Sequence, residues 1–116
     1  MQIEVSSDSH VSASEEFISE IKAEMEQAFS RFAEQLTRLE IHLGDENSHK
    51  SGERDKRCLI EARLAGLDPV AVTDHAESLD MAISGAVKKL EKTLNRTLGR
   101  LDHKKGRTSF AGEQEI

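Results

Sequence analysis

The sequence predicts an α+β two-layer sandwich with the element order β-α-β-β-β-α, in which two helices cover one face of a four-stranded mixed sheet. Two observations support this prediction. Two long segments, residues 13–36 and 78–105, have apolar side chains every three to four positions, which is the period of an amphipathic helix. Four shorter segments alternate apolar and polar residues, as strands with one buried face do. The 116 residues are enough for one domain with a small core.

The first strand and the first helix are predicted from the start of the chain. Alternating apolar and polar residues indicate a strand over residues 2–6. Ser12 and Glu15 have the spacing of a capping box, so we expect Ser12 to be the N-cap of the helix over residues 13–36. The apolar stripe of this helix contains Phe17, Ile21, Met25, Ala28, Phe29, Phe32 and Leu36.

Three further strands are predicted over residues 38–43, 56–65 and 70–75, each with apolar residues at alternate positions. Residues 44–55 form a polar stretch that we expect to be a flexible loop, and residues 66–69 contain the Gly and Pro of a turn. These short connections make the three strands an antiparallel meander. The helical crossover from the first strand to the second makes that pair parallel.

The last helix is predicted over residues 78–105, with Ser78 as its N-cap. Its apolar stripe contains Leu79, Ile83, Ala86, Val87, Leu90, Leu94, Leu98 and Leu101. Gly85 lies within this helix and is expected to allow close packing on the sheet. The chain therefore divides into a single domain over residues 1–105 and a flexible tail over residues 106–116.

Charge is distributed unevenly along the chain. The net charge is −6, but residues 88–107 contain eight Lys or Arg and two acidic residues, which gives a local charge of +6. A basic helix face on an acidic protein can bind the phosphates of a nucleic acid. The alternative is an ordinary solvated face, because Lys and Arg are favoured near helix C-termini. The basic side chains lie off the apolar stripe at Lys88, Lys89, Lys92, Arg96, Arg100, Lys104 and Lys105.

The sequence gives little support for an enzyme or a metal-binding protein. The sequence contains no motif of a catalytic nucleophile, phosphate-binding loop or dinucleotide site, so we expect neither an enzyme nor a cofactor nor a small-molecule substrate. The five His show no HxxxH spacing, and His42 and His75 are placed on the open face of the sheet, so no metal site is predicted. The single Cys58 is expected in the core of a protein from a reducing cytoplasm.

Two further absences concern location. The sequence has no run of eighteen apolar residues, so we expect no membrane span. The first ten residues lack the basic and apolar regions of a secretion signal.

Two segments resemble the ribosome hibernation promoting factor family, which is also called protein Y, ribosomal subunit interface protein or sigma-factor modulation protein. AESLDMAISGAVKKLEKTLNR at residues 76–96 is similar to the family pattern of an acidic residue, an aromatic residue or Met, Ala-Ile-Asp, and Lys-Leu in the middle of the last helix. MEQAFSRF at residues 25–32 is similar to the pattern Leu-Glu-x-x-Phe-x-Arg-Ile. The likeness extends over most of residues 1–105. It indicates a short form without the C-terminal domain that pairs two ribosomes in longer members.

The resemblance implies a ribosome-associated factor that binds the RNA of the small ribosomal subunit near the decoding region and inhibits translation in stationary phase or stress. Such a factor would be cytoplasmic, and we expect a monomer. The resemblance implies RNA phosphate contacts by Lys89, Lys92, Arg96 and Arg100 of the last helix and by Arg31 of the first. Charge alone adds Lys88, Lys104 and Lys105.

Departures from the family pattern leave a second hypothesis open. Ser84 stands where the pattern has Asp, and Glu24 stands where the family usually has Lys. The exposed side of the predicted first helix is mostly acidic, with Glu16, Glu20, Glu24 and Glu34. The alternative function is therefore a diverged family member that acts as a protein-interaction module and binds a basic protein through this helix.

Overall fold

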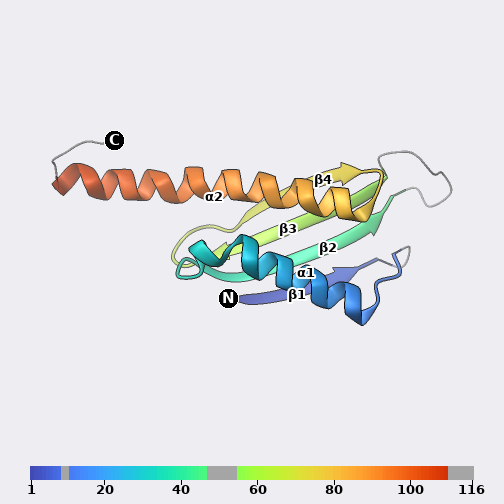
Figure 1. Ribbon diagram of the computed structural model, residues 1–116. Coiled ribbons are helices and arrows are strands. Elements are labelled where there is room, and N and C mark those ends of the chain that lie inside the picture. Colours follow the sequence, from blue (N-terminus) through green and yellow to red (C-terminus); the bar gives the residue numbers. More distant parts are fainter. Residues whose placement is uncertain (9–10, 47–54, 110–116) are drawn as a thin grey trace.

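The computed structural model describes residues 1–8, 11–46 and 55–109, with side chains described as far as Gly99. It confirms the predicted α+β class and the element order β-α-β-β-β-α (Figure 1). A short 3₁₀ turn, η1, follows the first helix. The elements are β1 (Gln2–Ser7), α1 (Glu15–Ala28), η1 (Ser30–Phe32), β2 (Leu36–Asp45), β3 (Lys56–Leu64), β4 (Val70–Ala76) and α2 (Leu79–Ser109).

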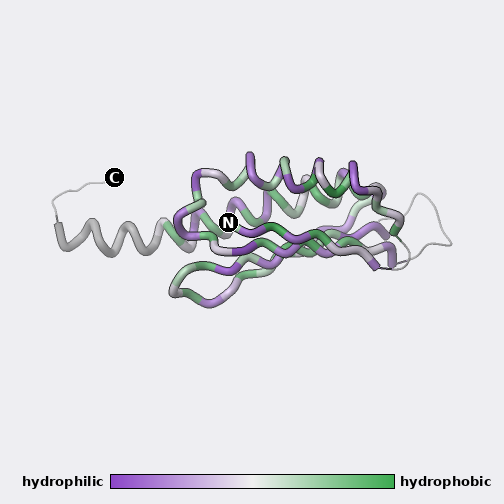
Figure 2. The backbone as a smooth tube through the Cα atoms, turned by 90° about the horizontal axis from the view of Figure 1, so that it is seen from below, coloured by the Kyte–Doolittle hydropathy of each residue, from purple (hydrophilic) through white to green (hydrophobic). Residues whose placement is uncertain are grey.

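The four strands form one mixed sheet in the order β1-β2-β3-β4. As predicted, β1 is parallel to β2, and β2, β3 and β4 form an antiparallel meander. In the register of the sheet, Val5 pairs with Ile41 and Ile41 with Ile60, so apolar side chains of successive strands stand on one face. Both helices cover this face, and the other face is open (Figure 2).

The core fills the space between the sheet and the helices. Phe29 and Met25 of the α1 region, Ile60 of β3 and Leu94 of α2 have no exposed surface. Cys58 is also fully buried among them, as predicted. Burial raises the pKa of the Cys58 thiol to about 12, and the negative charges of Asp74 and Glu24 add to the rise. The thiol is therefore protonated at neutral pH and acts as a small apolar core group.

The boundaries of the first helix differ from the prediction. Its N-cap is Ser14 and not Ser12: Ser14 Oγ accepts a hydrogen bond of 3.1 Å from the Phe17 N–H. The helix ends at Ala28, and the φ of −114° at Phe29 interrupts it before η1. Because the 3₁₀ turn keeps the three-residue spacing of its apolar side chains, the helical pattern continues in the sequence beyond the helix itself. Leu36, expected at the end of the helix, begins β2.

The last helix begins as predicted and ends later. Ser78 Oγ accepts a hydrogen bond of 3.2 Å from the Met81 N–H, which confirms Ser78 as the N-cap. The helix continues to Ser109, four residues beyond the expected end at residue 105, and it extends past the end of the sheet (Figure 1). The predicted tail beyond Ser109 and most of the predicted loop, residues 47–54, lie outside the described residues.

The two glycines within α2 have different surroundings. A Cβ added at Gly85 would overlap the carboxylate of Asp74 in β4, whereas a Cβ added at Gly99 would have no neighbour within 4 Å. Gly85 thus permits the close packing of α2 on the sheet that the sequence predicts. At Gly99 no contact requires glycine.

These surroundings predict opposite effects of Ala on stability. Gly99→Ala should raise the free energy of unfolding by up to about 1 kcal/mol, because Ala is the better helix former. In Gly85→Ala the same gain should be cancelled or reversed, because the Asp74 side chain must move. Urea denaturation of the two variants, with unchanged m-values, makes the comparison. An equal gain at both positions would contradict the close contact at Gly85.

Candidate nucleic-acid interface

Three cations of α2 form a row along its exposed side. Lys88, Lys92 and Arg96 follow one another at four-residue intervals, so they lie on one side of the helix and span about 12 Å. All three are exposed. In the part of the chain that the structure describes, none of them forms an ion pair or a side-chain hydrogen bond. We call these three residues the α2 basic row.

Lys89 has a different environment from its neighbours. Its Nζ donates a hydrogen bond of 2.7 Å to the backbone oxygen of Thr73 and lies 3.0 Å from Asp74 Oδ1. Both partners belong to β4, at the point where Gly85 lets the helix approach the sheet. The Lys89 side chain is still 54% exposed, but the Asp74 carboxylate neutralises part of its charge.

Arg31, the predicted contact from the first helix, lies in η1 and not in α1. Its guanidinium carbon is 4.6 Å from the centroid of the Phe32 ring, a cation–π contact that limits the motion of an exposed side chain. Phe32 itself is buried in the core. The predictions at Arg100, Lys104 and Lys105 concern side chains outside the described set, although their backbone belongs to α2.

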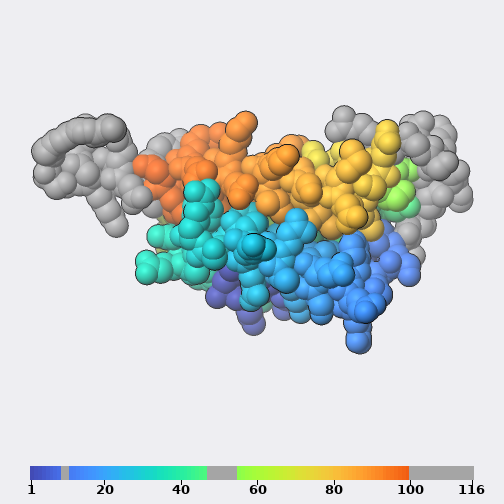
Figure 3. Space-filling view, in the orientation of Figure 1, coloured from blue at the N-terminus to red at the C-terminus, as the bar shows by residue number. Residues whose placement is uncertain are grey.

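The α2 basic row shares the helical layer with an acidic surface. Glu16, Glu20 and Glu24 are exposed on α1. The helix α1 lies beside α2 on the same face of the molecule (Figure 3). An anionic partner is attracted to α2 and repelled by α1. The layer therefore favours an approach of such a partner along α2, and the RNA contact expected at Arg31 in η1 stays a prediction.

Cations of the sheet are largely paired. Arg38 donates hydrogen bonds of 2.6 Å to both Glu4 and Glu40. The hydrogen bond between Arg38 and Glu40 raises the pKa of Arg38 and lowers that of Glu40. Lys56 lies 3.3 Å from the carboxylates of both Asp45 and Asp55. Although desolvation opposes its charge, hydrogen bonds to these two carboxylates raise its pKa. Among the described residues, the α2 basic row is thus the place where free cations are aligned.

These observations define a class of protein: a small two-layer α+β domain with a candidate nucleic-acid interface on its last helix. The sequence model of the family described as sigma 54 modulation protein / S30EA ribosomal protein matches residues 3–102. The chain therefore belongs to this family, as the resemblance predicted.

Two solved structures have the same fold. The N-terminal domain of Protein Y from Thermus thermophilus is 19% identical, with a TM-score of 0.66 over 84% of this chain and 99% of that chain. A ribosomal subunit interface protein from Coxiella burnetii is 15% identical, with a TM-score of 0.64 over 85% of this chain and 99% of that chain. A search of curated proteins found no match. None of the described helices has the length and apolar character needed to cross a lipid bilayer.

Proposed function

We propose that this protein binds the RNA of the small ribosomal subunit near the decoding region through α2 and inhibits translation in stationary phase or stress. The observation that carries the proposal is the α2 basic row, three free and aligned cations on a protein with a net charge of −6. Family membership supports it, as does the fold shared with a ribosomal subunit interface protein. In this proposal the protein is a cytoplasmic monomer without catalytic activity.

The physical basis of binding is the release of counterions from RNA phosphates. Lys and Arg that neutralise phosphates displace condensed cations, and this gain does not depend on base sequence. Because the row contains few cations and the rest of the chain is acidic, affinity for an arbitrary nucleic acid is low. Selectivity for one RNA site must then come from the shape of the folded RNA and the fit of the domain into it.

Sedimentation with purified subunits tests the proposal directly. The protein should co-migrate in sucrose gradients with small subunits at low salt, and it should bind large subunits more weakly. Addition of the protein to a cell-free translation reaction should reduce synthesis in proportion to the bound fraction. Absence of co-migration at low salt, or equal binding to both subunits, would contradict the proposed target.

The structure predicts that Lys89 contributes less to RNA binding than Lys92. Each phosphate contact raises the affinity for RNA about five- to eightfold at 0.1 M salt. Lys92→Ala should lower the affinity by this whole factor. Lys89→Ala should lower the affinity by less than half of this factor, because Asp74 already pairs with Lys89. Lys89→Ala should also lower the free energy of unfolding by up to about 1 kcal/mol, a small effect because the pair is partly exposed. Binding titrations and thermal unfolding of both variants measure the two effects; equal losses of affinity would contradict the assignment.

A second candidate function uses the acidic surface of α1. Glu16, Glu20 and Glu24 are exposed and, in the described part of the chain, form no ion pair with other residues. Such a surface could bind a basic protein by electrostatic attraction. Pull-down from a ribosome-free lysate separates the two functions. A partner that is lost in Glu20→Lys, together with no association with ribosomal subunits, would favour this function over the first.

A further inference from the structure

Three glutamates form a row across the open face of the sheet. Glu4 of β1 pairs in register with Glu40 of β2, and Glu40 pairs in register with Glu61 of β3. Carboxylates at directly opposite positions repel one another and destabilise a sheet unless a cation neutralises them. Arg38 bonds Glu4 and Glu40, but it forms no ion pair with Glu61. Arg63 stands opposite Arg38 in the register and its charge acts on Glu40, but in the described part of the chain no arginine forms an ion pair at the Glu61 end of the row.

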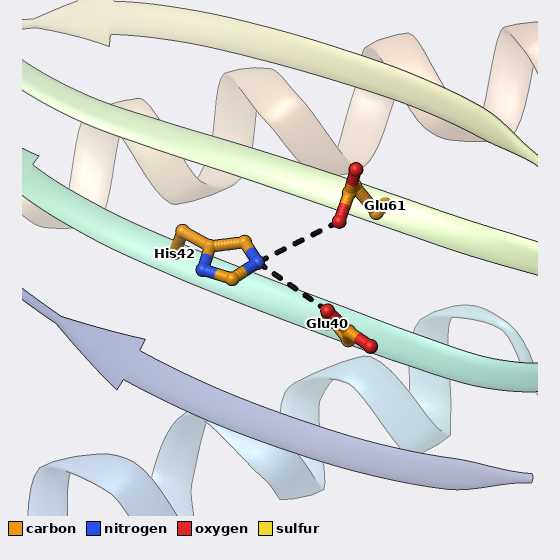
Figure 4. A group of neighbouring side chains, drawn as sticks. All are labelled: Glu40, His42 and Glu61. Carbon is orange, nitrogen blue, oxygen red and sulfur yellow. Dashed lines mark ion pairs between the residues drawn. The ribbon is translucent and has the colours of Figure 1, made fainter.

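His42 stands at that end of the row. Its Nε2 lies 3.6 Å from Glu40 Oε1 and 3.7 Å from Glu61 Oε1, and the ring nitrogen points between the two carboxylates (Figure 4). Both distances are longer than an ordinary hydrogen bond. They are close to the separation of about 3.4 Å between two ligands of one tetrahedral ion with bonds of about 2.1 Å. Each of the three residues offers one possible ligand atom, and these three atoms all lie within 4.8 Å of one another.

Groups behind the three residues hold two of them in place. Ser6 Oγ lies 2.9 Å from His42 Nδ1, and when Nδ1 donates its proton to Ser6, the lone pair of Nε2 faces the carboxylates. Glu40 uses its other oxygen, Oε2, to accept a hydrogen bond of 2.6 Å from Arg38 Nε. Outer partners of this kind orient histidine and carboxylate ligands in known metal sites.

The geometry points to a divalent transition-metal site formed by His42 Nε2 and one carboxylate oxygen each from Glu40 and Glu61, with Zn²⁺ as the fitting ion. Two carboxylates balance the charge of the ion, and water completes four-coordination. The imidazole ligand favours Zn²⁺ over Mg²⁺ and Ca²⁺, which prefer oxygen ligands alone. The site lies on the face of the sheet opposite the helices, so it is independent of the proposed binding of RNA by α2.

Calorimetric titration of the metal-free protein with Zn²⁺ tests the site. The wild-type protein should bind one ion, and His42→Gln and Glu61→Gln should each weaken binding at least tenfold. Ser6→Ala should weaken it about tenfold, as loss of an outer partner does. His75→Gln is the matched control, since His75 also lies beside a carboxylate, 3.2 Å from Glu46 Oε1, but outside the cluster of three. It should keep wild-type affinity.

A second measurement needs only the wild-type protein. Co²⁺ in the site should show the visible absorption of a four-coordinate ion, and NMR shifts on addition of Zn²⁺ should be largest at residues 40–42 and 61. Absence of saturable binding would overturn the proposal, and so would shifts centred elsewhere. Wild-type affinity in a folded His42→Gln variant would overturn it as well.

Discussion

Reversal of charge along the α2 basic row, by Lys88→Glu, Lys92→Glu and Arg96→Glu together, is expected to abolish association with the small ribosomal subunit. Three lost phosphate contacts, at about five- to eightfold each in 0.1 M salt, amount to a loss of about a hundredfold or more. Repulsion between the new carboxylates and RNA adds to this loss. Quantitative co-sedimentation measures it. The fold should persist, because all three side chains are exposed and form no ion pairs in the described part of the chain.

A control of equal charge change shows whether position matters. Lys22 of α1 is also exposed and, among the described residues, has no ion pair. Lys22→Glu and Lys92→Glu alter the net charge by the same amount. We expect Lys92→Glu to lower affinity at least tenfold and Lys22→Glu to lower it only slightly, through long-range repulsion that salt screens. Similar losses in both variants would indicate a general effect of net charge and contradict a specific role of α2.

Replacement of Phe29 by Ala should have the largest effect on stability. Phe29 is fully buried at the end of α1, and its ring centroid lies 6.4 Å from that of Phe32. It is the C-cap of α1 and belongs to the hydrophobic core at the point where the chain turns from α1 into η1. Truncation of a buried Phe costs about 3–5 kcal/mol, because apolar contacts are lost and a cavity remains. A small domain has a total stability of about 5–15 kcal/mol, so much of the variant should be unfolded at moderate urea concentrations.

Met81 provides the contrast for this experiment. Its side chain is 58% exposed near the beginning of α2, so Met81→Ala should change the free energy of unfolding by less than about 0.5 kcal/mol. Urea denaturation followed by circular dichroism gives both values. If Phe29→Ala were no more destabilising than Met81→Ala, this result would contradict the packing of Phe29 in the core between η1 and the sheet.

Alternation and periodicity were sufficient to predict the class of fold, and the connections between the strands predicted the direction of each strand pair. The alternation through Ile41 and Ile60 defines the buried face of the sheet, and the structure confirms it. Helix ends were harder to predict. Ser12 and Ser14 are both good N-caps by type, so residue type alone does not distinguish them, and the structure shows that Ser14 caps the helix. Leu36 fits the helical stripe as well as the strand, because both periods place an apolar residue there.

The candidate interface was only partly predictable for similar reasons. The helical period alone places Lys88, Lys92 and Arg96 off the apolar stripe, and the structure shows them exposed. The pairing of Lys89 with β4 could not be predicted, because it depends on how closely α2 packs at Gly85. Likewise, spacing rules for ligands on one element do not find the cluster around His42, whose members come from two strands and meet through their register.

The salt dependence of binding tests the central claim most directly, namely that free cations of α2 contact ribosomal RNA phosphates. Co-sedimentation of the wild-type protein and the triple charge-reversal variant should be measured between about 50 and 200 mM salt. For three contacts, we predict that the logarithm of wild-type affinity falls with the logarithm of salt concentration with a slope of about −2 to −3, and that the variant loses this dependence together with its binding. Tight binding of the wild-type protein that does not change with salt, or a variant that binds with the wild-type slope, would contradict the account.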